Sequence, residues 1–545
     1  MSVEIDTELA VLLDVGSAWA KASIIGRVRG RWRVVSHVRQ PTAWGAAELR
    51  GALLERLGRA VDPRLAARLD ELLASANRIE SHTARRPARL AVVAVSRELS
   101  GSAARRAAEA AGWQIVEQIT LDDGRSLADR LATLQAIDTD AWLVAGGFDG
   151  VRSPRALEAA ALVASARRRG GAPIVWAGSD ALGDEVASLF EPGAVAVVAN
   201  PRPDSRRDDA APLRDHLQAL LRSVVARDEE THLSAIAMPR AVSALAAGSG
   251  LRILAVDIGA RTAISALADP GGEVASRIHG GGGLAGLASV AGLAGRVSRL
   301  AGDAGDEAAV ADLLQTLRAR PASVPLTPEE LSAVQAAARV QVSALLEDAA
   351  PGQVDLLIGA GGTIASAPMP AQAARILLDG ARPLGVTQLA VDAASVLGPL
   401  GSLPDDEIGE GISLLTEDLL VPLGTSVVCR GGEPGRTAMR ITVHRPGWPP
   451  IAPIELRTGQ LQVLPLGRGQ EAELTIEPGL GVALGAARRS PRVQARATGG
   501  SVGLILDARG VPIVLPKRAD DRRAVLSAWR EALGREAPAG VERVA

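Results

Sequence analysis

The stretch "LAVDIGARTAIS", residues 254–265, ends an apolar run with an acidic residue and follows it with a glycine-containing turn. A strand that ends in Asp257 and turns at Gly259 offers a carboxylate beside backbone N–H groups, which suits a phosphate and its magnesium ion. The stretch "LAVLLDVGSAWAKASII", residues 9–25, repeats this order at a constant offset of 257 − 14 = 243 residues. One such turn is usually a plain hairpin, whereas a matched pair favours a nucleotide site between two lobes.

The composition sets limits on the classes of function. A chain of 545 residues is long enough for two to four domains. With 60 basic and 62 acidic residues, the net charge of −2 provides no electrostatic surface for nucleic acid or an anionic membrane. The single cysteine, Cys429, excludes an internal disulfide and a cysteine-based zinc site. No apolar run reaches roughly 18 residues and no basic secretory signal opens the chain, which predicts a cytoplasmic protein.

The hydrophobic patterns divide the chain into regions. Two strand-like runs joined by a tight Gly-Ser turn, with a third run at 31–38, predict an antiparallel meander over 9–38. Short apolar runs that alternate with helical stretches predict a parallel, doubly wound sheet over 89–200. A charged amphipathic helix at 205–230 is expected to connect the two halves. The predicted domains are a first lobe that includes the wound region (9–250), a second lobe (251–415), a β domain (420–518), and a C-terminal helix with its tail (519–545).

A third glycine-rich segment complements the two hairpins. In "LLIGAGG", residues 356–362, the glycines Gly359, Gly361 and Gly362 remove side chains at a strand-to-helix junction. A flat base and its ribose could then approach the backbone closely. In contrast, the four glycines of "IHGGGG" after Ile278 lack a convincing preceding strand, and a flexible loop leading into a small-residue helix is expected there. Near the C-terminus, Asp507 and Arg509 are expected to form an ion pair within a β-hairpin.

In this order the motifs resemble those of the actin-like ATPase superfamily, which includes actin, sugar kinases and heat-shock chaperone ATPases. The resemblance covers residues 9–415 and implies an α/β fold: two actin-like lobes with ribonuclease H-like βββαβα cores, an α/β wound region in the first lobe, and a C-terminal mostly-β domain. It implies ATP and Mg²⁺ as cofactors. The residues that it assigns to them are Asp14, Gly16, Ser17 and Lys21 for phosphates and metal, Asp257, Gly259 and Thr262 from the other lobe, and Gly359, Gly361 and Gly362 for adenosine. The metal-facing carboxylates are Asp14 and Asp257.

A closer resemblance is to the MutL/GlmL family, accessory proteins of glutamate mutase that are unrelated to the mismatch-repair protein of similar name. It rests on "DVGSAWAK", "LVAGGFDG", "VWAGSDAL", "DIGARTAIS", "IGAGGTIA" and, as the most specific segment, "LLDGARPLGVTQLAVDAASVLGPLGSL" at 377–403. The resemblance implies an ATP-dependent reactivating chaperone or assembly factor for an adenosylcobalamin-dependent mutase of the glutamate mutase or aminomutase type. The Asp-x-His-x-x-Gly arrangement of many cobalamin proteins is absent, so cobalamin is expected on the partner.

The chain departs from the superfamily pattern at Ala18, Ala20, Ala260 and Ile264, where relatives carry hydroxyl, glycine or acidic residues, and slow hydrolysis is expected. No catalytic residue is assigned. Two alternatives stay open: a small-molecule kinase, for which Asp149 or Asp180 could supply a base, and an ATP-switched scaffold or polymerising protein. The oligomeric state is left open. The histidines have no metal-ligand spacing and are expected to be ordinary side chains: His37, His82, His216, His232, His279 and His444.

Overall fold

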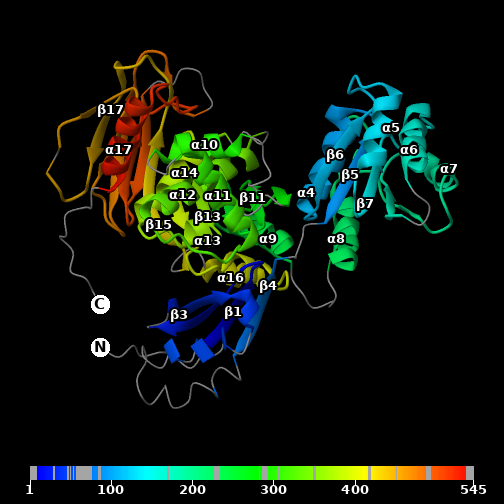
Figure 1. Ribbon diagram of the computed structural model, residues 1–545, viewed down its shortest axis with the longest axis horizontal. Coiled ribbons are helices and arrows are strands. Elements are labelled where there is room, and N and C mark those ends of the chain that lie inside the picture. The colour runs from blue at the N-terminus through cyan, green and yellow to red at the C-terminus, as the bar shows by residue number, and fades with distance from the viewer. Residues whose placement is uncertain are drawn as a thin grey trace. The chain divides into compact units, whose positions relative to one another are not determined.

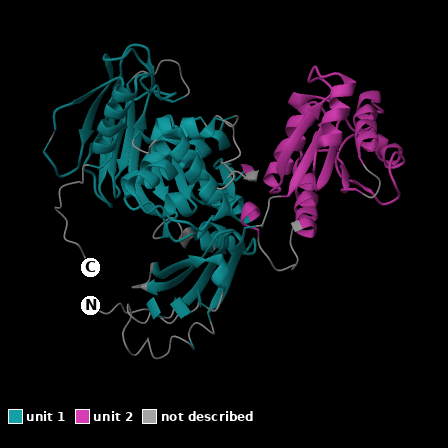
Figure 2. Cartoon of the chain, in the orientation of Figure 1, with its two compact units in different colours: residues 1–83, 237–274, 281–545 teal, residues 84–236, 275–280 magenta. Residues whose placement is uncertain are grey.

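The computed structural model divides into two compact units, shown in Figure 2: unit 1 with residues 1–83, 237–274 and 281–545, and unit 2 with residues 84–236 and 275–280. The residues that the structure describes are 9–28, 31–45, 48–49, 51–52, 55–56, 71, 76–83, 88–167, 171–225, 233–280, 283–284, 292–302, 306–347, 352–414, 419–449, 451–485 and 492–534. Among them, no helix is long and apolar enough to cross a membrane.

Unit 1 begins with the predicted meander. Its strands are β1 (Leu9–Val15), β2 (Trp19–Val28), β3 (Arg31–Pro41) and β4 (Asn77–His82), and a short η1 (Thr42–Trp44) follows β3. The sheet order is β3-β2-β1-β4, with β1, β2 and β3 antiparallel and β4 parallel to β1 (Figure 1). Alternate residues of β1, namely Leu9, Val11 and Leu13, are buried in one core cluster. The predicted strands are thus confirmed, and Ala10 and Leu12 on the opposite face of β1 are buried as well.

The second sheet of unit 1 opens with the same arrangement. The strands β10 (Ile253–Ile258) and β11 (Thr262–Ala268) form a hairpin, β12 (Val274–Gly280) follows in the chain, and β13 (Leu356–Ala360) and β14 (Gly385–Val391) run parallel to β10. Within unit 1 the sheet order is β11-β10-β13-β14-β15-β23-β19. A meander followed by two parallel strands confirms the βββαβα order predicted for the second lobe.

Small and aliphatic residues close the core around this sheet. The helices of this part are α9 (Ser234–Ser249), α10 (Leu293–Ala301), α11 (Glu307–Ala319), α12 (Pro328–Leu345), α13 (Gly362–Ala365), α14 (Pro370–Ala381), α15 (Leu397–Gly401) and α16 (Ile408–Leu414). As predicted, the Thr327 side chain caps α12 by accepting the Glu330 N–H. A Cβ at Gly380 would lie 2.6 Å from Val342, so glycine permits α12 and α14 to pack closely.

The C-terminal region is mostly β, as predicted. Its elements are β15 (Val421–Val428), β16 (Arg430–Gly431), β17 (Thr437–His444), β18 (Ile454–Arg457), β19 (Leu461–Leu464), β20 (Glu471–Pro478), β21 (Val482–Ala483), β22 (Val493–Thr498), β23 (Gly503–Asp507) and α17 (Ala519–Gly534). The strands β15, β23 and β19 extend the second sheet, while β18-β17-β20-β22 form another sheet. The second lobe and this region therefore share a sheet, and the domain boundary at 420 stays a prediction.

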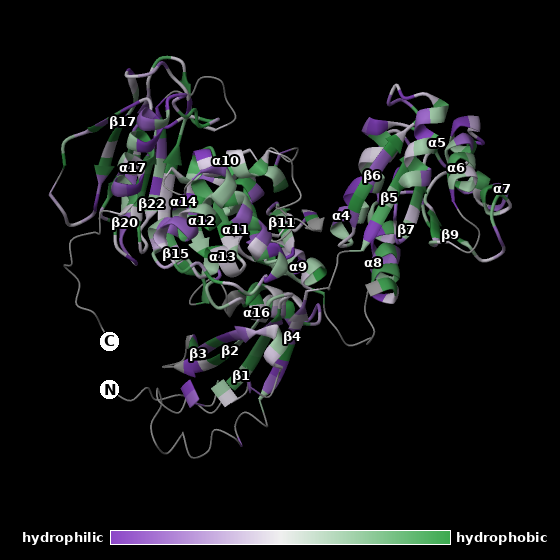
Figure 3. Cartoon of the chain, in the orientation of Figure 1, coloured by the Kyte–Doolittle hydropathy of each residue, from purple (hydrophilic) through white to green (hydrophobic). Residues whose placement is uncertain are grey.

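Unit 2 contains the predicted parallel sheet. Its strands are β5 (Arg89–Ala94), β6 (Gln114–Thr120), β7 (Ala141–Ala145), β8 (Ile174–Trp176) and β9 (Val195–Val197), all parallel and in the order β6-β5-β7-β8-β9. The flanking helices are η2 (Arg97–Gly101), α4 (Ser102–Ala110), α5 (Leu127–Ala136), α6 (Pro154–Ala166), η3 (Asp180–Leu182), α7 (Gly183–Ala187) and α8 (Ala211–Val225). Leu90 and Val92 pack in one core cluster and Ala91 and Val93 in another. Both faces are thus buried, which explains the continuous hydrophobic runs (Figure 3).

The helix predicted at 205–230 begins later and has a different role. The segment before it turns at Asp204, whose carboxylate accepts the backbone N–H groups of Arg206 and Arg207. Pro212, which lacks an N–H donor, sits in the first turn of α8. Leu213 and Leu217 bury the helix in the core of unit 2, so the expectation of a connector between halves was wrong. Residues 226–230 lie outside the described residues.

Candidate functional site

The two predicted hairpins close with the same hydrogen bond. The Gly16 N–H donates to the Trp19 carbonyl over 3.0 Å, and the Gly259 N–H donates to the Thr262 carbonyl over 3.0 Å. A Cβ would lie 2.7 Å from the acceptor oxygen at position 16 and 3.0 Å from it at position 259. The turn itself therefore requires glycine at position 16, and at position 259 a larger residue would have to displace the Thr262 carbonyl slightly. The offset of 243 residues in the sequence thus corresponds to a repeated backbone geometry.

A carboxylate ends the first strand of each hairpin, but only one of them faces a lysine. Asp14 lies opposite Lys21 in the β1–β2 register, and the lysine Nζ is 2.8 Å from the aspartate Oδ2. Both side chains are largely buried. Asp257 lies opposite Ile264 in the β10–β11 register, so no residue of its own hairpin neutralises it. Burial raises the pKa of Asp257 to about 6, an effect that Lys21 opposes and that the nearby Asp14 carboxylate reinforces.

A third strand-end carboxylate, Asp392, belongs to the same group. It follows β14, and its two oxygens accept the N–H groups of Val396 and Leu397, both over 2.9 Å. Burial raises its pKa, and it interacts electrostatically with Lys21 and Asp14. The sequence analysis missed it, although "LAVD" at 389–392 repeats "LAVD" at 254–257. That repeat was the available signal.

The three glycines of the predicted adenosine segment have different surroundings. Gly361 has φ +83°, and a Cβ there would lie 2.4 Å from Asp257 Oδ1, so glycine brings the backbone against this carboxylate. A Cβ at Gly359 would meet Ile364 at 2.6 Å, so the core packing requires glycine at that position. A Cβ at Gly362 would meet open space, and Gly362 lines a cavity. Of the three, Gly362 alone borders the cavity.

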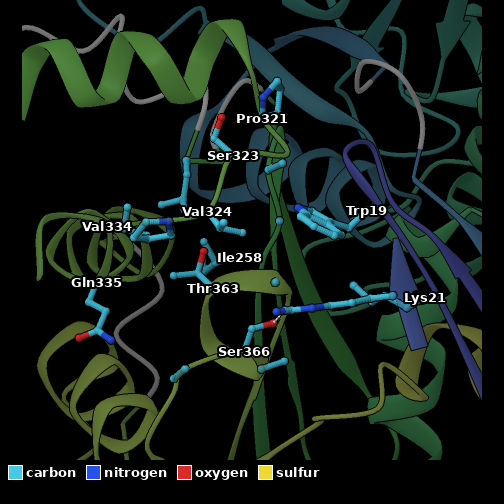
Figure 4. Close-up of a pocket in the computed structure, with 18 of the residues that line it drawn as sticks. Trp19, Lys21, Ile258, Pro321, Ser323, Val324, Val334, Gln335, Thr363 and Ser366 are labelled. Atoms are coloured by element: carbon cyan, nitrogen blue, oxygen red, sulfur yellow. Dashed lines mark hydrogen bonds between the residues drawn. The ribbon is translucent and has the colours of Figure 1, made fainter. Parts of the chain in front are cut away.

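This cavity lies within unit 1 and has a volume of ≈ 290 Å³. Lys21, Gly259 and Gly362 line it among the predicted residues. Figure 4 shows Trp19 and Lys21 on one side, Thr363 and Ser366 near the centre, and Val324 and Val334 across from Lys21. Its wall is therefore polar near the hairpins and mostly apolar along α12 and the segment before it, where Ser323 and Gln335 are the polar lining residues.

The remaining predicted residues lie at the hairpins, outside the cavity lining. Asp14 contacts the cavity-lining Lys21, and Asp257 contacts the Gly361 backbone. Gly16 and the half-buried Ser17 form the first turn, and the buried Thr262 begins β11. The structure thus groups the carboxylates, Lys21 and both glycine turns near one end of the cavity.

Four further lining residues were not expected from the sequence: Trp19, His37, Arg39 and Ser366. The Arg39 guanidinium lies 5.5 Å from the Trp19 ring centre and donates to the Ser366 hydroxyl. On β2 and β3, the lining residues recur at every second position, which places their side chains on one face of the sheet. This period-two spacing after the Asp-x-Gly turn is the signal that could have identified Trp19, His37 and Arg39.

His37 differs from the ordinary histidine that the sequence analysis expected. The Ser23 hydroxyl donates to the Ala394 carbonyl over 2.8 Å and lies 2.9 Å from His37 Nδ1. Because the single hydroxyl hydrogen is committed to Ala394, Nδ1 carries the proton and donates to Ser23, which leaves Nε2 as an acceptor. Burial, together with the Lys21 charge, lowers the pKa of His37 to about 4, so its ring is neutral at pH 7.

The carboxylates considered for a kinase base lie in unit 2. Asp149 accepts from the Asn200 amide over 3.0 Å, and Asp180 accepts the Gly150 N–H over 2.6 Å. A Cβ at Gly146 would lie 2.3 Å from Val95, and one at Gly178 would lie 2.4 Å from the Gly146 carbonyl. The strand-end turns are thus packed against one another and held by internal bonds. In the described part of the chain, no three acidic, histidine or cysteine side chains form a metal-binding group.

The residues around the cavity fit a nucleotide and a hydrated cation. Carboxylate oxygens are preferred ligands of Mg²⁺, which keeps several of its waters and needs few protein ligands. Asp257 is buried and has no partner on its own hairpin. The space between its carboxylate and the backbone of residue 361 is open because Gly361 has no Cβ. The apolar wall suits a planar base, and the cationic Lys21 suits phosphates.

Comparison with known families gives one match. A family model described as "MutL protein" matches residues 10–419, about three quarters of the chain. The matched range contains both hairpins and the three glycines, and it ends two residues before β15. No curated protein matches the chain.

Solved structures resemble the chain only weakly. A nucleotide-free acetone carboxylase is 11% identical, with 83% of this chain and 81% of that chain covered and a TM-score of 0.29. Xylulose kinase from Bifidobacterium adolescentis is 11% identical, with 79% and 97% covered and a TM-score of 0.25. The ethanolamine utilization protein EutJ from Carboxydothermus hydrogenoformans is 13% identical, with 73% and 91% covered and a TM-score of 0.22. Similarity at this level carries no argument about activity.

Proposed function

The chain belongs to the MutL protein family, and from this premise we propose that it is an ATP-binding accessory protein that services an adenosylcobalamin-dependent mutase of the glutamate mutase or aminomutase type. The observation that carries the ATP-binding part is the pair of matched hairpins, whose carboxylates lie next to a cavity with one cationic and one apolar end. The partner is proposed from the family and its resemblance to mutase accessory proteins.

In this proposal each group has a separate task at the nucleotide. Lys21 contacts the phosphates as a cation, and Asp14 and Asp257 hold Mg²⁺ through its water shell. The metal ion neutralises phosphate charge when bound. At Gly361 and Gly362 the backbone lies against the adenosine. The Trp19 ring and the Arg39 guanidinium offer a stacked surface next to Ser366.

Turnover is proposed to be slow. Ala18 lies in the turn of the first hairpin, Ala20 follows that turn, and Ala260 lies in the turn of the second hairpin. Ile264 is buried opposite Asp257. These residues offer no hydroxyl or carboxyl group to position a water or the γ-phosphate. A missing polar group at such a site typically costs about 3 kcal/mol of barrier, roughly a hundredfold in rate. His37, with a neutral ring and an acceptor nitrogen, is a side chain of the first sheet on the cavity wall that could orient a water by accepting its hydrogen.

The accessory role requires that nucleotide and partner affect each other. If the mutase prefers one nucleotide state of this protein, nucleotide binding must change mutase affinity by the same factor. Co-elution of the full chain with mutase subunits is therefore expected to differ between ATP and no nucleotide.

Titration calorimetry with the full chain tests the nucleotide proposal. ATP with Mg²⁺ is expected to bind at least tenfold more tightly than UTP with Mg²⁺, because the apolar cavity and the glycine backbone would contact the base. Equal affinity for the two nucleotides would contradict the adenosine assignment. A kinase instead of an accessory protein would be indicated by phosphoryl transfer to a small molecule without any nucleotide-dependent mutase association.

A further inference from the structure

A second group of charged residues lies away from the nucleotide cavity, where the C-terminal region joins the second lobe. Arg509 follows β23 and contacts Asp507 through two bonds, Nε–Oδ1 at 2.9 Å and Nη2–Oδ2 at 2.6 Å. It also reaches Asp379 of α14, Nη1–Oδ1 at 2.7 Å. The ion pair expected between Asp507 and Arg509 is confirmed, and it is buried. The other Asp379 oxygen accepts from Arg339 of α12 over 3.0 Å.

The positive charges in this buried group outnumber the negative ones. Besides Arg339 and Arg509, Arg375 of α14 lies close, its Nε 3.5 Å from Asp379 Oδ2. Arg375 is mostly buried, and its Nε and Nη2 have no hydrogen-bond partner among the described residues. Three guanidinium groups thus share two carboxylates. An uncompensated buried charge is costly, and unsatisfied buried donors often mark an ion or water.

A small pocket opens beside this group. Its volume is ≈ 60 Å³, and it is lined by Arg339 and Asp379, by Arg296 and Arg382, and by apolar residues that include Trp529. A cavity needs about 10–15 Å³ to hold one water molecule, so this pocket has room for a small oxyanion but not for a nucleotide. The helices that form it are α10, α12, α14 and α17, and α17 contacts α10 and α14 (Figure 1).

Two of the arginines have free donors at the pocket. In the part of the chain that the structure describes, the Arg296 guanidinium has no partner, and its side chain is exposed. Arg382 uses only Nε, which donates to the Asp379 carbonyl over 3.3 Å. Arg382 also has φ +50°, an uncommon conformation for a residue other than glycine, and it caps α14. Planar guanidinium donors around a small pocket match the geometry of an oxyanion.

We propose that this pocket binds a small inorganic oxyanion, with phosphate as its chemical type, between Arg296, Arg339 and Arg382. The anion supplies negative charge at Arg339, which belongs to the buried group whose guanidinium groups outnumber its carboxylates, although Arg375 and Arg509 themselves do not line the pocket. The proposal does not depend on the nucleotide site, since the two cavities share no lining residue. The shared helix α12 lines the nucleotide cavity at Val334 and the anion pocket at Val340.

Thermal unfolding of the full chain in sodium phosphate, at constant ionic strength set with sodium acetate, tests this proposal. Phosphate is expected to raise the Tm of the parent by roughly 2 °C or more between 0.1 and about 30 mM. The double variant R296A/R382A is expected to lose this response. Arg299→Ala changes an exposed arginine of the same helix outside the pocket and should keep it. An equal response in the double variant, or no response in the parent, would overturn the site.

Two further variants keep the test decisive. Ser343 lines the pocket, and Ser343→Asp would bring a carboxylate to it; this variant is expected to raise the Tm without phosphate and to weaken the phosphate response. An unchanged phosphate response in Ser343→Asp would contradict the proposal even if R296A/R382A failed to fold. Lys21→Met removes the cation that lies beside Asp14 at the nucleotide cavity and should keep the phosphate response. If Lys21→Met abolishes the response instead, the phosphate binds in the nucleotide cavity and the second site is wrong.

Discussion

Asp257 is the residue whose protonation should control nucleotide binding. Its pKa is raised from 3.8 to about 6, chiefly by burial, and a magnesium ion prefers the ionised carboxylate. Affinity for magnesium-ATP is therefore expected to fall as the pH drops through 6, approaching about tenfold per pH unit below it. Without ligand, the pH dependence of the free energy of unfolding has the opposite sign. Because the carboxyl pKa is higher in the folded state, protonation of Asp257 as the pH falls through 6 stabilises the fold.

Calorimetric titrations with magnesium-ATP between pH 5 and pH 8 would measure this dependence. The matched control is Asp257→Asn, which cannot ionise at this position and should give weaker binding with a flatter profile. His37 is expected to contribute nothing in this window, because its pKa lies near 4. A parent profile as flat as that of the variant would show that Asp257 is not the titrating ligand.

Lys21 is expected to stabilise the fold as well as the nucleotide. It is the cation paired with Asp14, and the charges of Asp257 and Asp392 also raise its pKa against the opposing effect of burial. Lys21→Met leaves these carboxylates without their cation, and the free energy of unfolding should fall by about 3–5 kcal/mol. Denaturant unfolding of Lys21→Met, Asp14→Asn and the double variant measures this loss. A double variant less damaged than the sum of both would support direct pairing, and strict additivity would contradict it.

At the scale of single residues, repetition in the sequence was the useful signal. Asp14 and Asp257 could be found because the two hairpins share the same order of apolar run, aspartate and glycine turn. Asp392 could have been found because "LAVD" occurs both at 254–257 and at 389–392. Gly359 shows the limit of this method, since the packing of Ile364 against it, and not a ligand, accounts for glycine there. Spacing could have placed His37 on the same strand face as Arg39, but no spacing rule predicts that Ser23, which bonds to His37, also donates to Ala394, because Ser23 and Ala394 are far apart in the chain.

At the junction between β13 and α13, two glycines should respond differently to substitution by alanine. Gly359→Ala would place a methyl group 2.6 Å from Ile364, and overpacking of this kind typically costs about 1–3 kcal/mol. Gly362→Ala meets open space, so stability should hold while ATP affinity falls, because the methyl group narrows the cavity. Thermal unfolding and ATP titration of both variants separate the two effects. The atom that would clash is Ile364 Cγ2, which leucine lacks, so restored stability in Gly359→Ala with Ile364→Leu would confirm the packing cause.

The helices and strands were predictable where local chemistry decides them. Neighbouring residues alone were enough to predict the Thr327 cap, the amphipathic C-terminal helix and the strands of the meander around their Gly-Ser turn. The position of α8 was not predictable in this way, because tertiary burial of Leu213 and Leu217 determines which sheet it covers. Likewise, no local pattern shows that β15 pairs with β14 and β23 with β15, since these pairings join distant segments into one sheet.

At the scale of the whole molecule, the proposed site requires one property above all: nucleotide binding that depends on a metal ion held by both hairpins. Asp14 and Asp257 come from different sheets of unit 1, and each lies at the end of a strand followed by a glycine turn. Binding that used only one hairpin, or only the apolar cavity wall, would not need the other carboxylate. The dependence on magnesium and on Asp257 is therefore the most direct test of the two-hairpin site.

The measurement is the affinity of the full chain for ATP, by titration calorimetry with and without Mg²⁺, in the parent and in Asp257→Asn. The parent is expected to bind ATP at least tenfold more tightly with Mg²⁺ than without it. Asp257→Asn, which preserves the shape of the side chain, should retain the fold and the unfolding temperature while losing most of this magnesium dependence. Equal ATP affinity in all four titrations, or no ATP binding by the parent, would contradict the two-hairpin nucleotide site.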